Sequence, residues 1–170
     1  MIYIRKFLLE PTQSLWSYCL MAVPIALFPT LGLFVIACGI LSFIGVNVTE
    51  LLLQRPSMVT DTSVIGLVFG SVIFSPIVET FLLAGLLKVL SKASSRSAFI
   101  AAYAAIIWGG LHGLFGILWF FGTVWSFFVF SCSFISWRKL SFKQAFIAAA
   151  APHALVNFIV VLVIVLSPRI

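Results

Sequence analysis

Long apolar segments separated by short polar breaks follow one another along the whole chain. The segments cover about positions 15–44, 62–90, 97–114, 117–137 and 144–166, and nearly all charged residues fall in the breaks. An α-helix needs about 20 mainly apolar residues to cross the hydrocarbon core of a bilayer. The pattern therefore predicts an all-α, polytopic membrane helix bundle of about five transmembrane helices, with residues 1–170 forming a single transmembrane domain.

The first segment is longer than one straight span and contains Pro24 and Pro29. A proline removes a helical hydrogen bond, so we expect a kink, a tilt or an interfacial first portion here. The basic N-terminus before this segment could open a secretory signal, but the apolar core of a signal is only about 7–15 residues long. We therefore predict a retained membrane helix, followed by a polar break at positions 47–61.

Composition supports the same class of protein. The chain is 63% hydrophobic and 8% charged, whereas soluble domains carry about 25% charged residues. Its three cysteines, Cys19, Cys38 and Cys132, all lie in apolar segments. They are interpreted as packing residues, not as disulfides or a metal cluster.

The basic residues predict how the chain is oriented in the membrane. With five spans and a cytoplasmic N-terminus, two of the ten basic residues, Arg55 and Arg169, fall outside. The other eight fall on the cytoplasmic side, as the positive-inside rule requires: Arg5, Lys6, Lys88, Lys92, Arg96, Arg138, Lys139 and Lys143. The net charge of +6 thus follows from membrane insertion, and we expect the lipid bilayer and no nucleic acid as a partner.

Three ionisable residues, Glu79, His112 and His153, lie deep inside apolar segments. A charged side chain at mid-membrane costs about 2.5–3.5 kcal/mol on insertion scales, so such residues suggest a functional site. Residues three or four apart share a helix face. By this spacing Ser75 and Ser71 share the face of Glu79, and alanines and a glycine share the faces of the two histidines. Small residues allow close approach of membrane helices, so we expect these three faces to pack together.

Two prolines lie next to these residues. Pro76 and Pro152 lack an N–H group and are predicted to free the carbonyls of Val72 and Ala148, four residues earlier. Broken helices are tolerated at membrane depth where they are buried in protein or line a wet cavity, which favours a water-accessible pocket. Asn157, one turn after His153, would by itself most simply form an interhelical hydrogen bond.

These residues together resemble the CAAX-protease and bacteriocin-processing family of intramembrane proteases, called CPBP or Abi. The family pattern is Glu-Glu-x-x-x-Arg, then aromatic-x-x-x-His, then His-x-x-x-Asn or Asp, each on its own helix. This chain has Glu79-Thr80-x-x-x-Ala84, Trp108-x-x-x-His112 and His153-x-x-x-Asn157 in the same order. Thr80 replaces the second Glu, Ala84 replaces the Arg, and Trp108 replaces the usual Phe.

The resemblance implies an intramembrane endopeptidase acting on a membrane-associated substrate, of which a prenylated CAAX protein is one option. It makes Glu79 the general base that activates a water and His112 the residue that holds the water or the substrate. His153 and Asn157 would stabilise the oxyanion, with Thr80 and Trp108 in supporting positions. It also implies location in a bacterial inner or cell membrane.

Other readings stay open at this stage. Glu79, His112 and His153 form a His2Glu set that zinc could use, although Thr80 would then leave no neighbouring acid as base; we favour a metal-free mechanism. Because the second Glu and the Arg are absent, a degenerate binding or immunity protein without activity is an alternative. A small proton-relay or transport subunit is another. The oligomeric state is not predicted.

Overall fold

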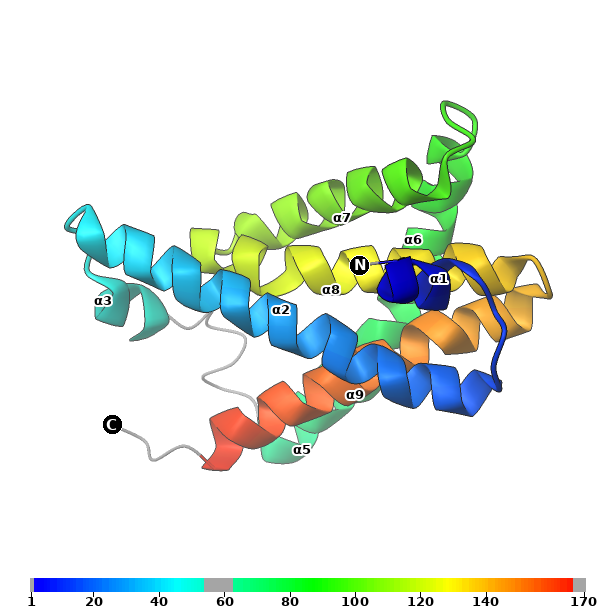
Figure 1. Cartoon of the computed structure of the whole chain (residues 1–170). Coiled ribbons are helices and arrows are strands. Elements are labelled where there is room, and N and C mark those ends of the chain that lie inside the picture. The colour runs from blue at the N-terminus through cyan, green and yellow to red at the C-terminus, as the bar shows by residue number, and fades with distance from the viewer. Residues whose placement is uncertain (1, 54–62, 167–170) are drawn as a thin grey trace.

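All the regular elements in the described part of the chain are helices. A computed structural model describes residues 2–53 and 63–166. In chain order the elements are α1 (Ile2–Leu9), α2 (Leu15–Phe43), α3 (Val48–Leu53), α5 (Val64–Val68), the π-helix η1 (Phe69–Phe74), α6 (Ser75–Leu90), α7 (Ser97–Gly113), α8 (Ile117–Arg138) and α9 (Phe142–Leu166). The longer helices lie against one another as a bundle (Figure 1), which confirms the predicted fold class.

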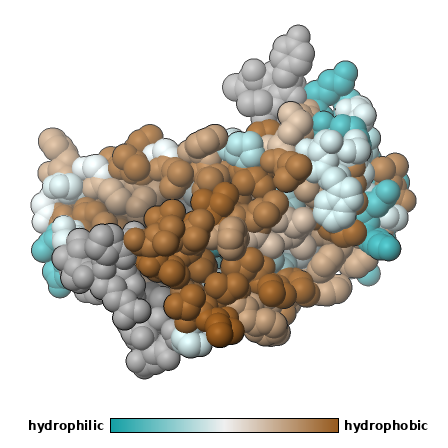
Figure 2. All heavy atoms as spheres, turned by 90° about the horizontal axis from the view of Figure 1, so that it is seen from below, coloured by the Kyte–Doolittle hydropathy of each residue, from teal (hydrophilic) through white to brown (hydrophobic). Residues whose placement is uncertain are grey.

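Four helical stretches are long and apolar enough to cross a membrane: Leu15–Phe43, Val64–Leu90, Ile117–Arg138 and Phe142–Leu166. The remaining predicted span, 97–114, corresponds to Ser97–Gly113, which is apolar but shorter. The predicted segments agree with these bounds to within a few residues, except that position 62 lies outside the described residues. Figure 2 shows hydrophobic residues over the middle of one face, with hydrophilic residues gathered towards its ends. The chain is an integral membrane protein.

Helix α8 lies at the centre of the bundle. Half of its apolar stretch is buried, against 22% for α2 and 33% for α9. It packs against α7, α2 and α9, and also against the short α1. Its buried side chains include large aromatic rings such as Phe127 and Phe130, together with small residues such as Ser133. Every candidate site helix therefore packs on α8 or on a helix that does.

Polar contacts join α2 to α8 at three levels. Tyr18 Oη donates to Ser133 Oγ at 2.9 Å, and the hydroxyls of Thr30 and Ser126 lie 2.9 Å apart. The third contact depends on a proline: Trp125 Nε1 donates to the Ile25 carbonyl at 2.9 Å. Pro29 lies four residues after Ile25 and has no N–H for that carbonyl. The α2 helix continues through both of its prolines, and a side chain of α8 replaces the missing donor.

The N-terminal segment forms a separate helix that the sequence did not predict. Leu8 of α1 is buried, and the Phe7 ring stacks on Tyr18 at 4.8 Å. The Nζ atom of Lys139 donates to the carbonyl of Leu9 at 3.1 Å. The α1–α2, α6–α7 and α8–α9 connections all lie at the same end of the bundle (Figure 1), which gathers the described basic clusters there.

Helices α7 and α8 form a tight hairpin, with a turn of three residues between Gly113 and Ile117. Gly116 has a φ of +143°, a conformation that side chains disfavour. Further along, a Cβ on Gly109 would lie 3.0 Å from Val124 Cβ and 3.3 Å from the Phe120 ring. Gly109 thus lets the two helices approach closely beside Trp108 and His112.

We predict that Gly109→Ala destabilises the bundle relative to Gly110→Ala. Both changes gain the same helix propensity, but a Cβ at Gly110 meets nothing within 4 Å. Overpacking a close contact costs about 1–3 kcal/mol, so Gly109→Ala should be less stable by that amount. Denaturant unfolding of both variants in detergent micelles measures the difference. Equal stabilities would contradict the close approach of α7 and α8.

Candidate functional site

Glu79 accepts hydrogen bonds on both carboxylate oxygens. Ser75 Oγ, one turn earlier on α6, donates to Oε1, and Trp108 Nε1 on α7 donates to Oε2 at 3.1 Å. The predicted face with Ser75 and Glu79 is thereby confirmed. Two donors stabilise the ionised carboxylate inside an apolar bundle. The Glu79 side chain keeps 20% of its surface exposed, so it is held in place but accessible.

His112 faces the same carboxylate, with Nε2 3.9 Å from Glu79 Oε2. Its Nδ1 lies 3.0 Å from the carbonyl oxygen of Trp108, one turn earlier. A carbonyl oxygen only accepts, so Nδ1 carries a proton, and in the neutral ring Nε2 is then an acceptor. Two acceptors therefore face each other across 3.9 Å. This arrangement favours a donor between them, such as a bridging water, or a proton on Nε2.

The ring of Phe127 on α8 contacts both α7 and α9, the helices that carry His112 and His153. It is 2% exposed, and its centroid lies 5.3–5.5 Å from the rings of Trp108, His112 and His153. Aromatic pairs at such distances each contribute about 0.5–1.5 kcal/mol beyond their buried area. The role of Phe127 was not predicted from the sequence, because a Phe in a Phe-rich helix gives no local signal.

His153 is held by packing. Its ring stacks on Phe130 at 4.8 Å and 20° and is 5% exposed. No described residue forms a hydrogen bond with its ring nitrogens. The rings of His153 and His112 both lie against Phe127. The predicted small-residue faces are confirmed, since Ala101, Ala105, Ala145 and Ala149 are at most 2% exposed.

Asn157 lies beside this cluster and contacts the backbone. Its Nδ2 donates to the carbonyl of Ser71 in η1 at 2.8 Å. The predicted effect of Pro76 was to free Val72, four residues back, as in an α-helix. In η1 the bonds instead span five residues, as the Ser75 N–H bond to the Gly70 carbonyl shows. The carbonyl that faces the missing N–H of Pro76 in this register is that of Ser71, so the acceptor differs from the predicted one.

The remaining predicted site residues divide between the cluster and its surroundings. Trp108 supports Glu79 directly, whereas Thr80 is 2% exposed and lies one position around the helix from Glu79. The described residues contain no group of three His, Cys, Asp or Glu side chains arranged to hold a metal ion. Glu79 and His112 are the two potential zinc donors that face each other.

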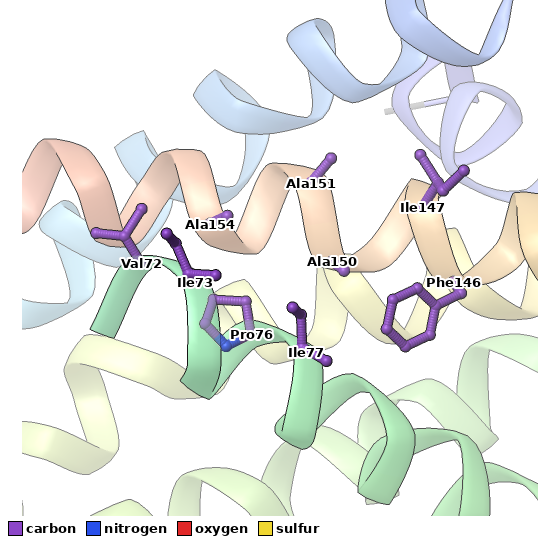
Figure 3. A pocket seen from close by; sticks show the side chains of 9 residues that line it. All are labelled: Val72, Ile73, Pro76, Ile77, Phe146, Ile147, Ala150, Ala151 and Ala154. Carbon is purple, nitrogen blue, oxygen red and sulfur yellow. The ribbon is translucent and has the colours of Figure 1, made fainter. Parts of the chain in front are cut away.

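An apolar groove of about 320 Å³ lies next to the cluster (Figure 3). Val72, Ile73, Pro76 and Ile77 form one wall, and positions 146–154 of α9 form the other. Pro76 belongs to both features, because its ring lines the groove while its missing N–H frees a backbone carbonyl. The groove thus runs beside the helix turn that precedes Glu79.

We predict that Trp108→Phe lowers stability more than Trp119→Phe. Hydrogen bonds to charged groups contribute about 1.5–3 kcal/mol, and Phe keeps a ring against Phe127 but cannot donate to Glu79. Trp119 is 42% exposed, so the matched change there should cost little. Denaturant unfolding measures both variants. In a Glu79→Ala background the cost of Trp108→Phe should fall, and an unchanged cost would show that the hydrogen bond contributes nothing.

Comparisons of the chain with protein-family models, curated proteins and solved structures found no match. The similarity to the CPBP family therefore rests on the motif residues Glu79, Trp108, His112, His153 and Asn157. They lie on α6, α7 and α9, in the family's order. The function of this cluster is inferred below from its geometry.

Proposed function

We propose that the protein is an intramembrane endopeptidase of the CPBP type that hydrolyses a peptide bond with a water activated by Glu79. The observation that carries this proposal is the 3.9 Å gap between Glu79 Oε2 and His112 Nε2. A water in this gap donates one hydrogen bond to each atom and keeps its lone pairs free to attack a carbonyl carbon. The bond from His112 to the Trp108 carbonyl keeps Nε2 turned towards that water.

In the proposed reaction, the water oxygen bonds to the substrate carbonyl carbon while Glu79 takes a proton from the water. The N–H of His153 donates to the carbonyl oxygen as it becomes negative; removal of one such donor typically costs about 10²–10³ in rate. Glu79 then delivers its proton to the amide nitrogen as the C–N bond breaks, which yields a carboxyl group and an amine. Asn157 Nδ2 is engaged with Ser71, so the oxyanion role falls to His153.

The substrate in this proposal is membrane-associated. The apolar groove beside Pro76 has room for hydrocarbon or an apolar peptide segment, which suits either a transmembrane or a prenylated substrate. We further propose a cytoplasmic N-terminus, since the basic residues of the α6–α7 and α8–α9 connections share one end (Figure 1). The CPBP resemblance further suggests a bacterial inner or cell membrane. Labelling of the Lys92→Cys variant by an impermeant maleimide tests the orientation. Labelling from outside the cell would contradict the proposed cytoplasmic N-terminus.

A second candidate is a catalytically degenerate member that binds a peptide or a partner membrane protein, for instance in bacteriocin immunity. Thr80 and Ala84 favour it, because they stand where the family has Glu and Arg. A proton-relay or transport subunit is the third candidate, in which Glu79 and His112 pass protons. These candidates differ in whether a peptide bond is cleaved and whether protons cross the membrane.

We predict that Glu79→Gln lowers peptide cleavage by at least about 10²-fold, since general base catalysis contributes about 10²–10⁴-fold. The assay uses proteoliposomes and two quenched fluorescent peptide pools, one with a farnesylated C-terminal cysteine and one with a transmembrane segment. Glu50→Gln, at an exposed position of α3, is the matched control and should cleave normally.

Cleavage that persists in folded Glu79→Gln protein would refute the glutamate mechanism. No cleavage by wild-type protein of either pool, with biological function intact in Glu79→Gln and His153→Ala, would favour the binding role. Proton flux in vesicles that is lost in the same variants would favour the relay.

We also predict that wild-type cleavage survives treatment with 1,10-phenanthroline, because the proposed water is held by Glu79 and His112 alone. Initial rates before and after chelation measure this. A loss of activity that added Zn²⁺ restores would instead support zinc on Glu79, His112 and His153.

A further inference from the structure

We propose that Asn157 is a positioning residue: its amide replaces the N–H that Pro76 lacks, holds η1 in its π-helical register, and so keeps Glu79 turned towards His112. The effect of Asn157 on the helical register of η1 does not depend on the proposed function. The consequence for catalysis rests on the proposed function.

The first step concerns backbone hydrogen bonds. The N–H of Ser75 bonds to the carbonyl of Gly70, five residues earlier. The next donor in that register would belong to Pro76, and the next acceptor is the carbonyl of Ser71. Proline has no N–H, so the Ser71 carbonyl has no backbone donor in this register. An unsatisfied carbonyl inside an apolar bundle is costly. An α-helical register would pair Ser71 with Ser75 but leave the Val72 carbonyl facing Pro76, so only a donor from outside the helix makes the π register the better satisfied of the two.

The second step is the replacement donor. Asn157 Nδ2 lies 2.8 Å from the Ser71 carbonyl oxygen, within the range of a normal hydrogen bond. The two residues are 86 positions apart, so the bond also joins α9 to η1. While this bond is present, the Ser71 carbonyl has a donor in the π register.

The third step links the register to Glu79. Ser75, the first residue of α6, ends the π register and donates to Glu79 Oε1. A π-helix accommodates one residue more than an α-helix over the same rise, and one residue corresponds to a rotation of about 100°. Collapse of η1 to an α-helix would therefore rotate Ser75 and Glu79 about the helix axis relative to α5. Glu79 would then turn away from Trp108 and His112.

A second proline-freed carbonyl in this chain also accepts a hydrogen bond from a side chain of another helix. Pro29 leaves the Ile25 carbonyl without its helical donor, and Trp125 Nε1 donates to it at 2.9 Å. This second pair joins α2 to α8, and its freed carbonyl lies in a regular α-helix. It therefore provides a matched control, in which a proline-freed carbonyl is satisfied without any contact to η1 or α6.

The first measurement is a double-mutant cycle on unfolding. Asn157→Leu keeps the side-chain shape but removes the donor, and should raise the unfolding equilibrium constant about 10-fold or more, because a buried acceptor loses its partner. Pro76→Ala supplies a backbone N–H to Ser71, so in that background the effect of Asn157→Leu should shrink to about 3-fold or less. An equal effect in both backgrounds would overturn the proposal.

The second measurement reports the position of Glu79 in folded protein. In protein labelled with 5-fluorotryptophan, the ¹⁹F signal of Trp108 is assigned by its loss in Trp108→Phe. Asn157→Leu should move this signal towards its position in Glu79→Ala, and adding Pro76→Ala should return it. Trp125→Phe, which also removes a donor from a proline-freed carbonyl, should leave it in place. A Trp108 signal unmoved by Asn157→Leu would overturn the proposal. Neither measurement requires peptide cleavage, so failure of the proposed function would leave both interpretable.

Discussion

Backbone carbonyls that lose their helical donor decide how the helices of this bundle meet. In hydrocarbon there is no water to satisfy such a group, so another part of the protein has to. Trp125 of α8 does this for Ile25 in α2, and Asn157 of α9 does it for Ser71 in η1. Each contact requires one helix at one depth and one rotation. The prolines therefore specify neighbours as well as breaking local hydrogen bonds.

The polar cluster depends on this arrangement and on one apolar ring. Phe127 touches Trp108, His112 and His153, so the aromatic core of α8 sets the spacing of groups carried by α7 and α9. Glu79 is turned towards them by its bonds to Ser75 and Trp108. Glu79 thus accepts two hydrogen bonds while 20% of its side-chain surface stays exposed, which is what the proposed general base requires.

The sequence predicted the bundle well because long apolar segments have few alternatives in a membrane. It also identified Glu79, His112 and His153 as candidate site residues, because ionisable residues are rare among apolar neighbours. Small residues on the same helix faces indicated where these helices pack. It did not predict η1, because a change from four-residue to five-residue hydrogen bonding leaves no pattern in side-chain hydrophobicity. The role of Phe127 and the packing of α1 were missed for a related reason: both depend on contacts between distant segments. The sequence predicted that Asn157 forms an interhelical hydrogen bond, and it does. That its acceptor is the Ser71 carbonyl could not be predicted from the spacing of residues.

The two proline-freed carbonyls that accept a hydrogen bond from a distant side chain also bear on how the protein is assembled in the cell. Ile25 and Trp125 are 100 residues apart, and Ser71 and Asn157 are 86 apart. In each pair the acceptor is synthesised well before its donor. Since synthesis proceeds from the N-terminus, α2 and η1 emerge with an unmet backbone acceptor and must wait for α8 and α9. Until α9 is inserted, the Ser71 carbonyl has to accept a hydrogen bond from water or from another protein, and neither contact can form before its later helix is in place.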